Sequence, residues 1–203
     1  MIHIHHLRIG RSVFTVWLVE ELGLDYTLTI YERDRHMRAP PELRKAHPLG
    51  KSPVIEDGDL RLAESGAIAA YLIDTYDPEH RLAPPRDDVA ARARWTQWLH
   101  YSEGSAFVPL LIKLLLRGDS EPALIGGFAD GEVSLHLGYM EDFLGDKAFL
   151  LGERLQGPDF GATYIVHMAE RLGLLQPYPR LQAYRERNMA RPAFLRAMER
   201  TGG

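Results

Sequence analysis

One short stretch of the chain places a carboxylate and a hydroxyl where a helix is expected to begin. Residues 53–63 form two short apolar runs separated by Asp57-Gly58, a pair that readily supplies the left-handed backbone of a tight hairpin turn. Glu64 and Ser65 follow, and the apolar run at 67–73 is typical of a helix with a broad buried face. Ser65 is therefore expected at the N-cap, where free N–H groups attract a carboxylate. The alternative is that Ser65 only caps the helix, while Glu64 favours its dipole.

The chain contains no cysteine. It can therefore form no disulfide, no thiolate nucleophile and no Cys-x-x-Cys redox pair of its own. Any thiol chemistry must use a thiol that a ligand brings in.

Composition narrows the class of protein. The 203 residues are 45% hydrophobic and 26% charged with a net charge of −4, so there is no overall electrostatic case for nucleic acid or an anionic membrane. No apolar run approaches the roughly 18 residues of a spanning helix, and the first residues lack a basic region with an apolar core. We expect no secretory signal and a cytoplasmic location.

The first half of the sequence alternates strand and helix patterns. Residues 2–6 and 26–31 alternate as strands do, and the helix expected at 13–22 is apolar almost all round, with Gly23 ending it. This unit implies parallel strands with a right-handed crossover. A short helix is expected at 42–46, before the hairpin. The order β-α-β-α-β-β-α is that of a thioredoxin-like domain.

The second half shows no convincing strand pattern and is expected to be all-helical. A proline-rich connector predicts a domain of residues 1–77, a linker of 78–86 and a helical domain of 87–203. The first helix is expected to run from Asp87 to about Arg117, with a kink at Pro109 and an end at Gly118. Further helices are predicted at 131–144, 159–172 and 179–189, and from about 192.

The hairpin-to-helix pattern, with a proline opening its first strand, resembles the glutathione-binding half of cytosolic glutathione transferases. Similarity also runs through Arg33-Asp34, residues 38–43 (RAPPEL) and residues 47–53 (HPLGKSP), which look like a serine-type subgroup found in fungi and bacteria. The resemblance is strong over roughly the first 80 residues and loose beyond them. It implies a homodimer, with the helix after Glu64 and the helix from Asp87 at the interface.

The resemblance also implies a set of glutathione-binding residues. Pro53 falls on the family's cis-proline, and the Ser52-Pro53 segment would pair with the cysteinyl unit of glutathione like an added strand. Ser65 would bind the γ-glutamyl carboxylate, and Glu64 would pair with the α-ammonium group.

Arg38 and Lys51 are candidates for the glycyl carboxylate, with solvated surface charge as the competing explanation. No metal is expected: His3 and His5 would share one strand face, but no further ligand has matching spacing.

Activation of the thiol is where this chain departs from the subgroup. A free thiol has a pKa of about 8.5, and lowering it by two units takes roughly 2.7 kcal/mol. A helix dipole gives about 0.3–1 kcal/mol and a hydrogen bond to a charged group about 1.5–3 kcal/mol, so a hydroxyl donor is normally needed. The subgroup carries Ser-Arg-Ser at this turn, whereas this chain has Gly10-Arg11-Ser12. Ser12, Arg11, backbone N–H groups or the hydroxyl of Tyr101 could replace the missing serine.

The sequence therefore predicts a glutathione transferase of detoxifying type. Glutathione would be the co-substrate, and its thiolate would attack a hydrophobic electrophile or a peroxide, with no metal and no covalent protein intermediate. Trp98, Tyr101 and Ser105 are possible linings of a hydrophobic pocket, although Trp95 and Trp98 could equally be helix-packing core. Because of Gly10, the alternative is a non-catalytic glutathione-binding or protein-interaction module. A scaffold that binds no glutathione is the third class.

Overall fold

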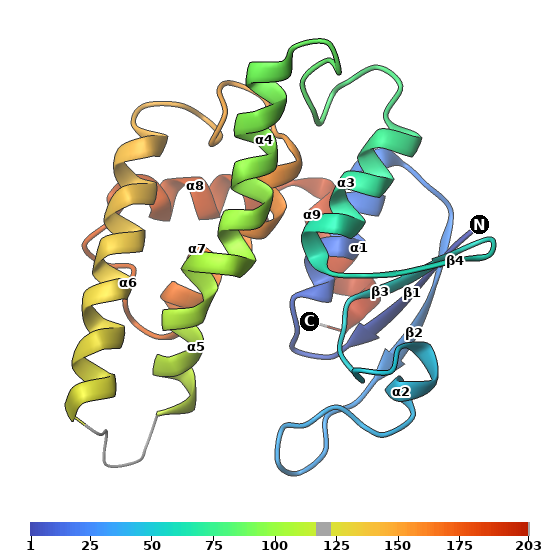
Figure 1. Ribbon diagram of the computed structural model, residues 1–203, viewed down its shortest axis with the longest axis horizontal. Helices are drawn as coiled ribbons and strands as arrows, with labels where there is room; N and C mark the ends of the chain where they lie inside the picture. The colour runs from blue at the N-terminus through green and yellow to red at the C-terminus, as the bar shows by residue number, and fades with distance from the viewer. Residues whose placement is uncertain (117–122, 203) are drawn as a thin grey trace. The chain divides into compact units, whose positions relative to one another are not determined.

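The computed structural model describes residues 1–116 and 123–202 (Figure 1). Its contacts divide the chain into two compact units. The first consists of residues 1–80 together with the C-terminal segment from Met189, and the second of residues 81–188. None of the helices in the described ranges is long and apolar enough to cross a bilayer.

A four-stranded mixed sheet forms the centre of the first unit. Its strand order is β2-β1-β3-β4, with β1 parallel to β2 and the other neighbours antiparallel. The register pairs Ile2 with Tyr26 and His5 with Val54. The strands are β1 (Ile2–Leu7), β2 (Tyr26–Tyr31), β3 (Val54–Asp57) and β4 (Leu60–Ala63), which confirms the predicted thioredoxin-like sheet.

Alternate residues of β1 face the helices on opposite sides of this sheet. Ile4 is fully buried and His6 contacts the first residue of α1, whereas Leu7 packs against the short helix α2. Helix α3 packs against α1 on the same side. The bounds are α1 (Ser12–Leu22), α2 (Leu43–Ala46) and α3 (Ser65–Tyr76).

Helix α9 (Pro192–Thr201) explains why α1 is apolar almost all round. It packs on α1 (Figure 1). The ring of Phe194 meets that of Trp17 edge-on, with 5.5 Å between the ring centres. Arg191 forms a two-pronged ion pair with Glu21 at 2.5 and 3.0 Å, and Arg196 pairs with Glu20 at 2.7 Å. The contacts therefore place this last helix in the first unit. The limits of the domains inferred from the sequence stay a prediction.

The regular elements in the described residues of the second unit are all helices, apart from an isolated bridge between Phe149 and Gly152. Helix α4 begins after Asp88, whose carboxylate accepts the N–H of Ala91 at 3.0 Å. The helices are α4 (Val89–Tyr101), the π-helix η1 (Ser102–Ala106), α5 (Phe107–Leu115), α6 (Ala123–Leu144), α7 (Gly157–Arg171) and α8 (Pro179–Met189).

The long helix predicted from Asp87 contains a π-helical segment shortly before Pro109. Pro109 has no N–H, and its ring crowds the carbonyl one turn earlier. The chain accommodates this with the π-helix η1, where the N–H of Phe107 reaches back five residues to the carbonyl of Ser102. The predicted end at Gly118 lies outside the described residues.

Candidate functional site

The segment that opens β3 is held on β1 by a side chain. The Ser52–Pro53 peptide bond is cis, as predicted, and Pro53 is buried. The hydroxyl of Ser52 donates to the carbonyl of His5 at 2.7 Å and accepts the N–H of Leu7 at 3.1 Å. It thus continues the β1–β3 pairing beyond its last residue pair, a role that the sequence did not suggest.

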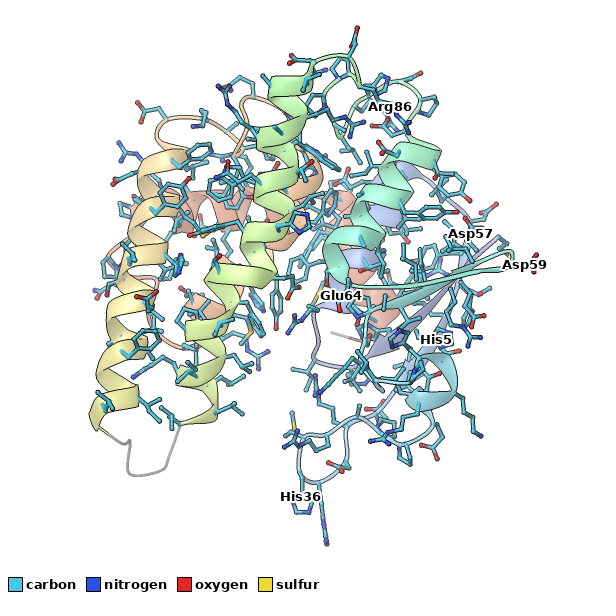
Figure 2. All side chains as sticks on the ribbon, viewed as in Figure 1. His5, His36, Asp57, Asp59, Glu64 and Arg86 are labelled. Carbon is cyan, nitrogen blue, oxygen red and sulfur yellow. The ribbon has the colours of Figure 1, made fainter. Side chains whose placement is uncertain are left out.

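The β3–β4 hairpin is tied to the helix that carries Ser65. Its two-residue loop is Gly58-Asp59, and Gly58 adopts a φ of 58°. The predicted turn was therefore one residue early, because Asp57 still pairs within the strands. The carboxylate of Asp57 (Figure 2) accepts hydrogen bonds from the hydroxyls of Tyr71, at 2.9 Å, and Tyr76, both in α3.

Glu64, not Ser65, is the N-cap of α3. Glu64 has a φ of 72°, and its carbonyl accepts the N–H of Ile68 at 2.9 Å, so the helix begins at Ser65. The predicted N-cap role of Ser65 was wrong by one residue, because the left-handed backbone at Glu64 makes the turn into the helix. The Glu64 side chain is exposed where β4 meets α3 (Figure 2). Ser65 is half-buried.

The turn between β1 and α1 has no space for a side chain at position 10. A Cβ on Gly10 would lie 2.7 Å from the carbonyl oxygen of Leu7, closer than packed atoms allow. Ile9, just before it, has a φ of 55°, an outlier for a β-branched residue. The usual serine is therefore excluded here by the backbone path.

Ser12 turns its hydroxyl toward β1. Its Oγ lies 2.9 Å from Nδ1 of His6, and both residues are buried. Burial, with Arg8 nearby, lowers the pKa of His6 from 6.5 to about 4, so this imidazole is neutral at pH 7. The predicted donation from Ser12 to a ligand sulfur would require this hydrogen bond to break. Arg11, at the N-cap of α1, is half-buried.

The remaining predicted cations of the first unit lie at its surface. Arg38 and Lys51 are both exposed, and neither forms an ion pair with the described part of the chain. The backbone N–H of Arg38 donates to the carboxylate of Asp34 at 2.9 Å, which orders the loop before α2. Both side chains are therefore accessible to an anionic ligand.

Tyr101 belongs to the second unit, where its hydroxyl lies 2.8 Å from Nδ1 of His136. Burial raises the pKa of this phenol well above its ordinary value. Trp98 is 1% exposed and stacks on Tyr139, and Nε1 of the buried Trp95 donates to the carbonyl of Leu82 at 3.0 Å. The two tryptophans are core residues of this unit, the alternative that the sequence left open.

The two strand histidines bond to neighbouring strands. His3 lies 2.7 Å from Thr27 Oγ1 and 2.9 Å from Thr29 Oγ1, one on each ring nitrogen. His5 bonds to the hydroxyl of Tyr31 at 2.9 Å, and Glu56 is 3.4 Å from its other nitrogen. Both rings take part in cross-strand pairs.

Sequence reasoning missed Arg33, which binds the turn before α1. Its guanidinium donates to the carbonyls of Arg8 at 2.9 Å, Ile9 at 3.1 Å and Met37 at 2.8 Å. The only available signal was the position of Arg33-Asp34 shortly after β2, within a segment that resembles the transferases.

Comparison with known proteins agrees with this geometry. Residues 4–74 match the family model described as the N-terminal domain of glutathione S-transferase. Glutathione S-transferase 3 of Schizosaccharomyces pombe is 30% identical, over 98% of this chain and 88% of its own length.

Solved structures extend the agreement to the whole described fold. A glutathione S-transferase from Actinobacillus pleuropneumoniae is 36% identical with a TM-score of 0.91, over 100% of this chain and 94% of the other. A family member from Pseudomonas fluorescens with two glutathione bound shares the fold at 24% identity, with a TM-score of 0.81 over 98% and 92% of the two chains. On the strength of these similarities, which span nearly all of both partners, the chain belongs to the glutathione S-transferase family.

Proposed function

We propose that this chain binds glutathione on its first unit and transfers the glutathione thiolate to a hydrophobic electrophile. The observation that supports this most directly is that Glu64 and Ser65 lie at the start of α3, directly after the β3–β4 hairpin. The cis Ser52–Pro53 segment precedes the first strand of the same hairpin and is hydrogen-bonded to β1. The absence of cysteine fits this chemistry, because the reacting sulfur then comes from the ligand.

Each end of glutathione has a proposed partner. The first N–H groups of α3 have no intrahelical acceptor, so they and the Ser65 hydroxyl would bind the γ-glutamyl carboxylate. The exposed carboxylate of Glu64 would pair with the α-ammonium group. The backbone beside Pro53 would pair with the cysteinyl unit, and Arg38 or Lys51 with the glycyl carboxylate.

The thiolate would be held mainly by backbone N–H groups of the turn that leads into α1, with the charge of Arg11 nearby. Gly10 supplies no hydroxyl, and the Ser12 hydroxyl is directed at His6. The helix dipole alone contributes about 0.3–1 kcal/mol, less than the roughly 2.7 kcal/mol that a two-unit shift of the thiol pKa takes. Direct hydrogen bonds from amides to the thiolate would supply the difference, at about 1.5–3 kcal/mol for a charged acceptor.

Three further features belong to the same proposal and rest on the family resemblance. The protein would be a cytoplasmic, detoxifying enzyme that also reduces peroxides. It would form a homodimer through α3 and the helix from Val89. Its electrophile would bind beside the residues of the helical unit near Tyr101 and Ser105.

Substitution of Ser65 tests the binding site. Ser65→Ala removes a hydrogen bond to a carboxylate, so glutathione affinity measured by titration calorimetry should fall roughly ten- to hundred-fold. Ser134→Ala is the matched control, because Ser134 is an exposed helical serine of the second unit. Equal affinity in wild type and Ser65→Ala would contradict the proposed site.

Substitution of Ser12 tests the thiolate donor. Because its hydroxyl bonds to His6, Ser12→Ala should keep turnover of an aromatic halide within about three-fold, while the unpaired imidazole nitrogen costs about 1–3 kcal/mol of stability. A loss of turnover by two orders of magnitude, with glutathione affinity intact, would assign the thiolate to Ser12 instead.

A non-catalytic glutathione-binding module is the second candidate, favoured by Gly10 and by the direction of the Ser12 hydroxyl. Tight glutathione binding by wild type, without turnover of an aromatic halide or of cumene hydroperoxide, would favour it. Turnover of either substrate would exclude it.

A further inference from the structure

The guanidinium of Arg33 is the centre of the turn that leads into α1. Its three nitrogens donate to the carbonyls of Arg8, Ile9 and Met37, at 2.9, 3.1 and 2.8 Å. Two of these carbonyls are consecutive in the β1–α1 turn, and the third lies in the loop before α2. One side chain thus joins two backbone segments that are 29 residues apart, from Arg8 to Met37.

We propose that Arg33 is a positioning residue for thiolate formation, which sets the direction of the amides in the β1–α1 turn. The inference rests on the proposed function, because the amides matter only if a glutathione sulfur lies before them. Arg33 itself would not touch the ligand.

The planar peptide bond links the direction of each carbonyl to that of the N–H group that follows it. In a trans peptide the C=O and the following N–H point in opposite directions. When Arg33 draws the carbonyls of Arg8 and Ile9 toward itself, the N–H groups of Ile9 and Gly10 must point away from it. Neither of these N–H groups has an acceptor within the described ranges of the chain. Two successive donors are therefore free to bind an anion.

The backbone conformation of Ile9 indicates that the hydrogen bonds from Arg33 hold this turn in place. Ile9 has a φ of 55° and is 49% exposed, so burial of its side chain does not explain this unfavourable conformation. The hydrogen bonds to the carbonyls on both sides of Ile9 do hold it. Such outliers persist where the surroundings over-determine them, and they concentrate at functional sites.

The absence of a side chain at Gly10 also contributes to this arrangement. A Cβ at this position would lie 2.7 Å from the carbonyl oxygen of Leu7 and 3.5 Å from Nη2 of Arg33. Because Gly10 has no side chain, the backbone at this position can lie close to the carbonyl of Leu7, and its N–H group stays accessible to a ligand. Gly10 thus lacks the hydroxyl that usually binds the thiolate, but it allows backbone N–H groups to bind the thiolate instead.

Arg33 also reaches the loop of Arg38, so the test must separate two effects. Asp34 accepts the N–H groups of His36, at 2.8 Å, and Arg38, at 2.9 Å, in the loop that Arg33 holds through Met37. A disturbed Arg38 would weaken glutathione binding without changing the ionisation of the bound thiol. A disturbed β1–α1 turn would change that ionisation.

The experiment compares Arg33→Gln and Arg33→Lys with wild type, and uses Arg35→Gln as the matched control. Arg35 is exposed in the same loop, and its side chain donates a hydrogen bond to Nε2 of His36 at 3.0 Å. The pKa of the bound thiol is measured from the ultraviolet absorbance of the thiolate at saturating glutathione, together with kcat/KM as a function of pH.

In Arg33→Gln we expect the thiol pKa to rise by about one unit, which is a tenfold loss of thiolate below that pKa. The loss in kcat/KM should shrink as the pH passes the new pKa. Lysine keeps the charge without the planar fork, so Arg33→Lys should raise the pKa by less. Arg35→Gln should match wild type.

A folded Arg33→Gln with an unchanged thiol pKa would overturn the inference, even if KM for glutathione rose. If Arg33→Gln does not fold, Arg33→Lys decides in the same way: a raised pKa supports the inference and an unchanged one overturns it. Failure of wild type to bind glutathione would overturn the proposed function itself.

Discussion

At the scale of single residues, the turn between β1 and α1 decides which chemistry is available. Gly10 is adjacent to the carbonyl of Leu7, and the hydroxyl of Ser12 is directed at a buried, neutral imidazole. The resemblance to serine-type transferases located this turn but could not show these contacts, because they depend on the backbone path through Ile9. In the proposed function, backbone N–H groups would therefore have to stabilise the charge on the glutathione sulfur.

Restoring a serine at position 10 should not restore the usual site. The new Cβ would lie 2.7 Å from a backbone oxygen, so Gly10→Ser should cost about 1–3 kcal/mol of stability in urea unfolding without raising turnover. Gly104→Ser is the control, since a Cβ there has no neighbour within 4 Å and the change should stay within about 0.5 kcal/mol. A stable Gly10→Ser with higher kcat would show that the turn adapts easily.

At the scale of elements, the packing of α9 on α1 stabilises the helix whose N-terminus faces the proposed thiolate. Phe194 is 3% exposed and contacts Trp17 and Phe14, at 5.5 and 5.9 Å between ring centres. Two ion pairs, from Arg191 and Arg196, flank this aromatic contact. The sequence indicated a nearly all-apolar α1, but not which element covers its outer face.

Truncation of Phe194 should destabilise the first unit. Phe194→Ala removes a buried aromatic ring, so the free energy of unfolding should fall by about 3–5 kcal/mol in urea titration. Leu195→Ala, one residue further along the same helix, removes a side chain that is 57% exposed and should change it by about 0.5 kcal/mol or less. Equal losses in the two variants would mean that α9 does not pack as described.

The spacing of apolar residues predicted most helices and strands, and it predicted their ends where a residue such as glycine or proline stops the element. The bounds of β2 and α8 agree with the predicted ranges, and Gly23 ends α1 with a φ of 68°. Periodicity did not predict the π-helix before Pro109, the start of α6 at Ala123 instead of residue 131, the N-cap at Glu64 or the exact position of the β3–β4 turn. At Glu64 the backbone is left-handed and before Pro109 it is π-helical, and a pattern of apolar spacing records neither conformation.

At the scale of the whole molecule, each unit contains a histidine that burial keeps neutral. Burial, aided by nearby arginines, lowers the pKa of His6 in the first unit and of His167 in the second from 6.5 to about 4. Between these values the unfolded chain binds more protons than the folded one, so stability falls as the pH falls from about 6.5 toward 4. Both units should therefore lose stability in mild acid.

The contribution of His6 can be isolated. Its shift predicts a loss of about 2 kcal/mol in the free energy of unfolding between pH 7 and pH 5. Urea titrations at the two pH values should show this loss reduced by that amount in His6→Gln and unchanged in His36→Gln, which alters an exposed histidine. The same pH dependence in His6→Gln and wild type would mean that His6 titrates normally in the folded chain.

The most direct measurement is a crystal structure of the chain with glutathione bound. It should show the γ-glutamyl carboxylate at the N-terminus of α3 beside Ser65, and the sulfur within hydrogen-bond distance of backbone N–H groups between residues 9 and 12. An unoccupied α3 terminus at saturating glutathione, or a sulfur held by the Ser12 hydroxyl, would contradict this account.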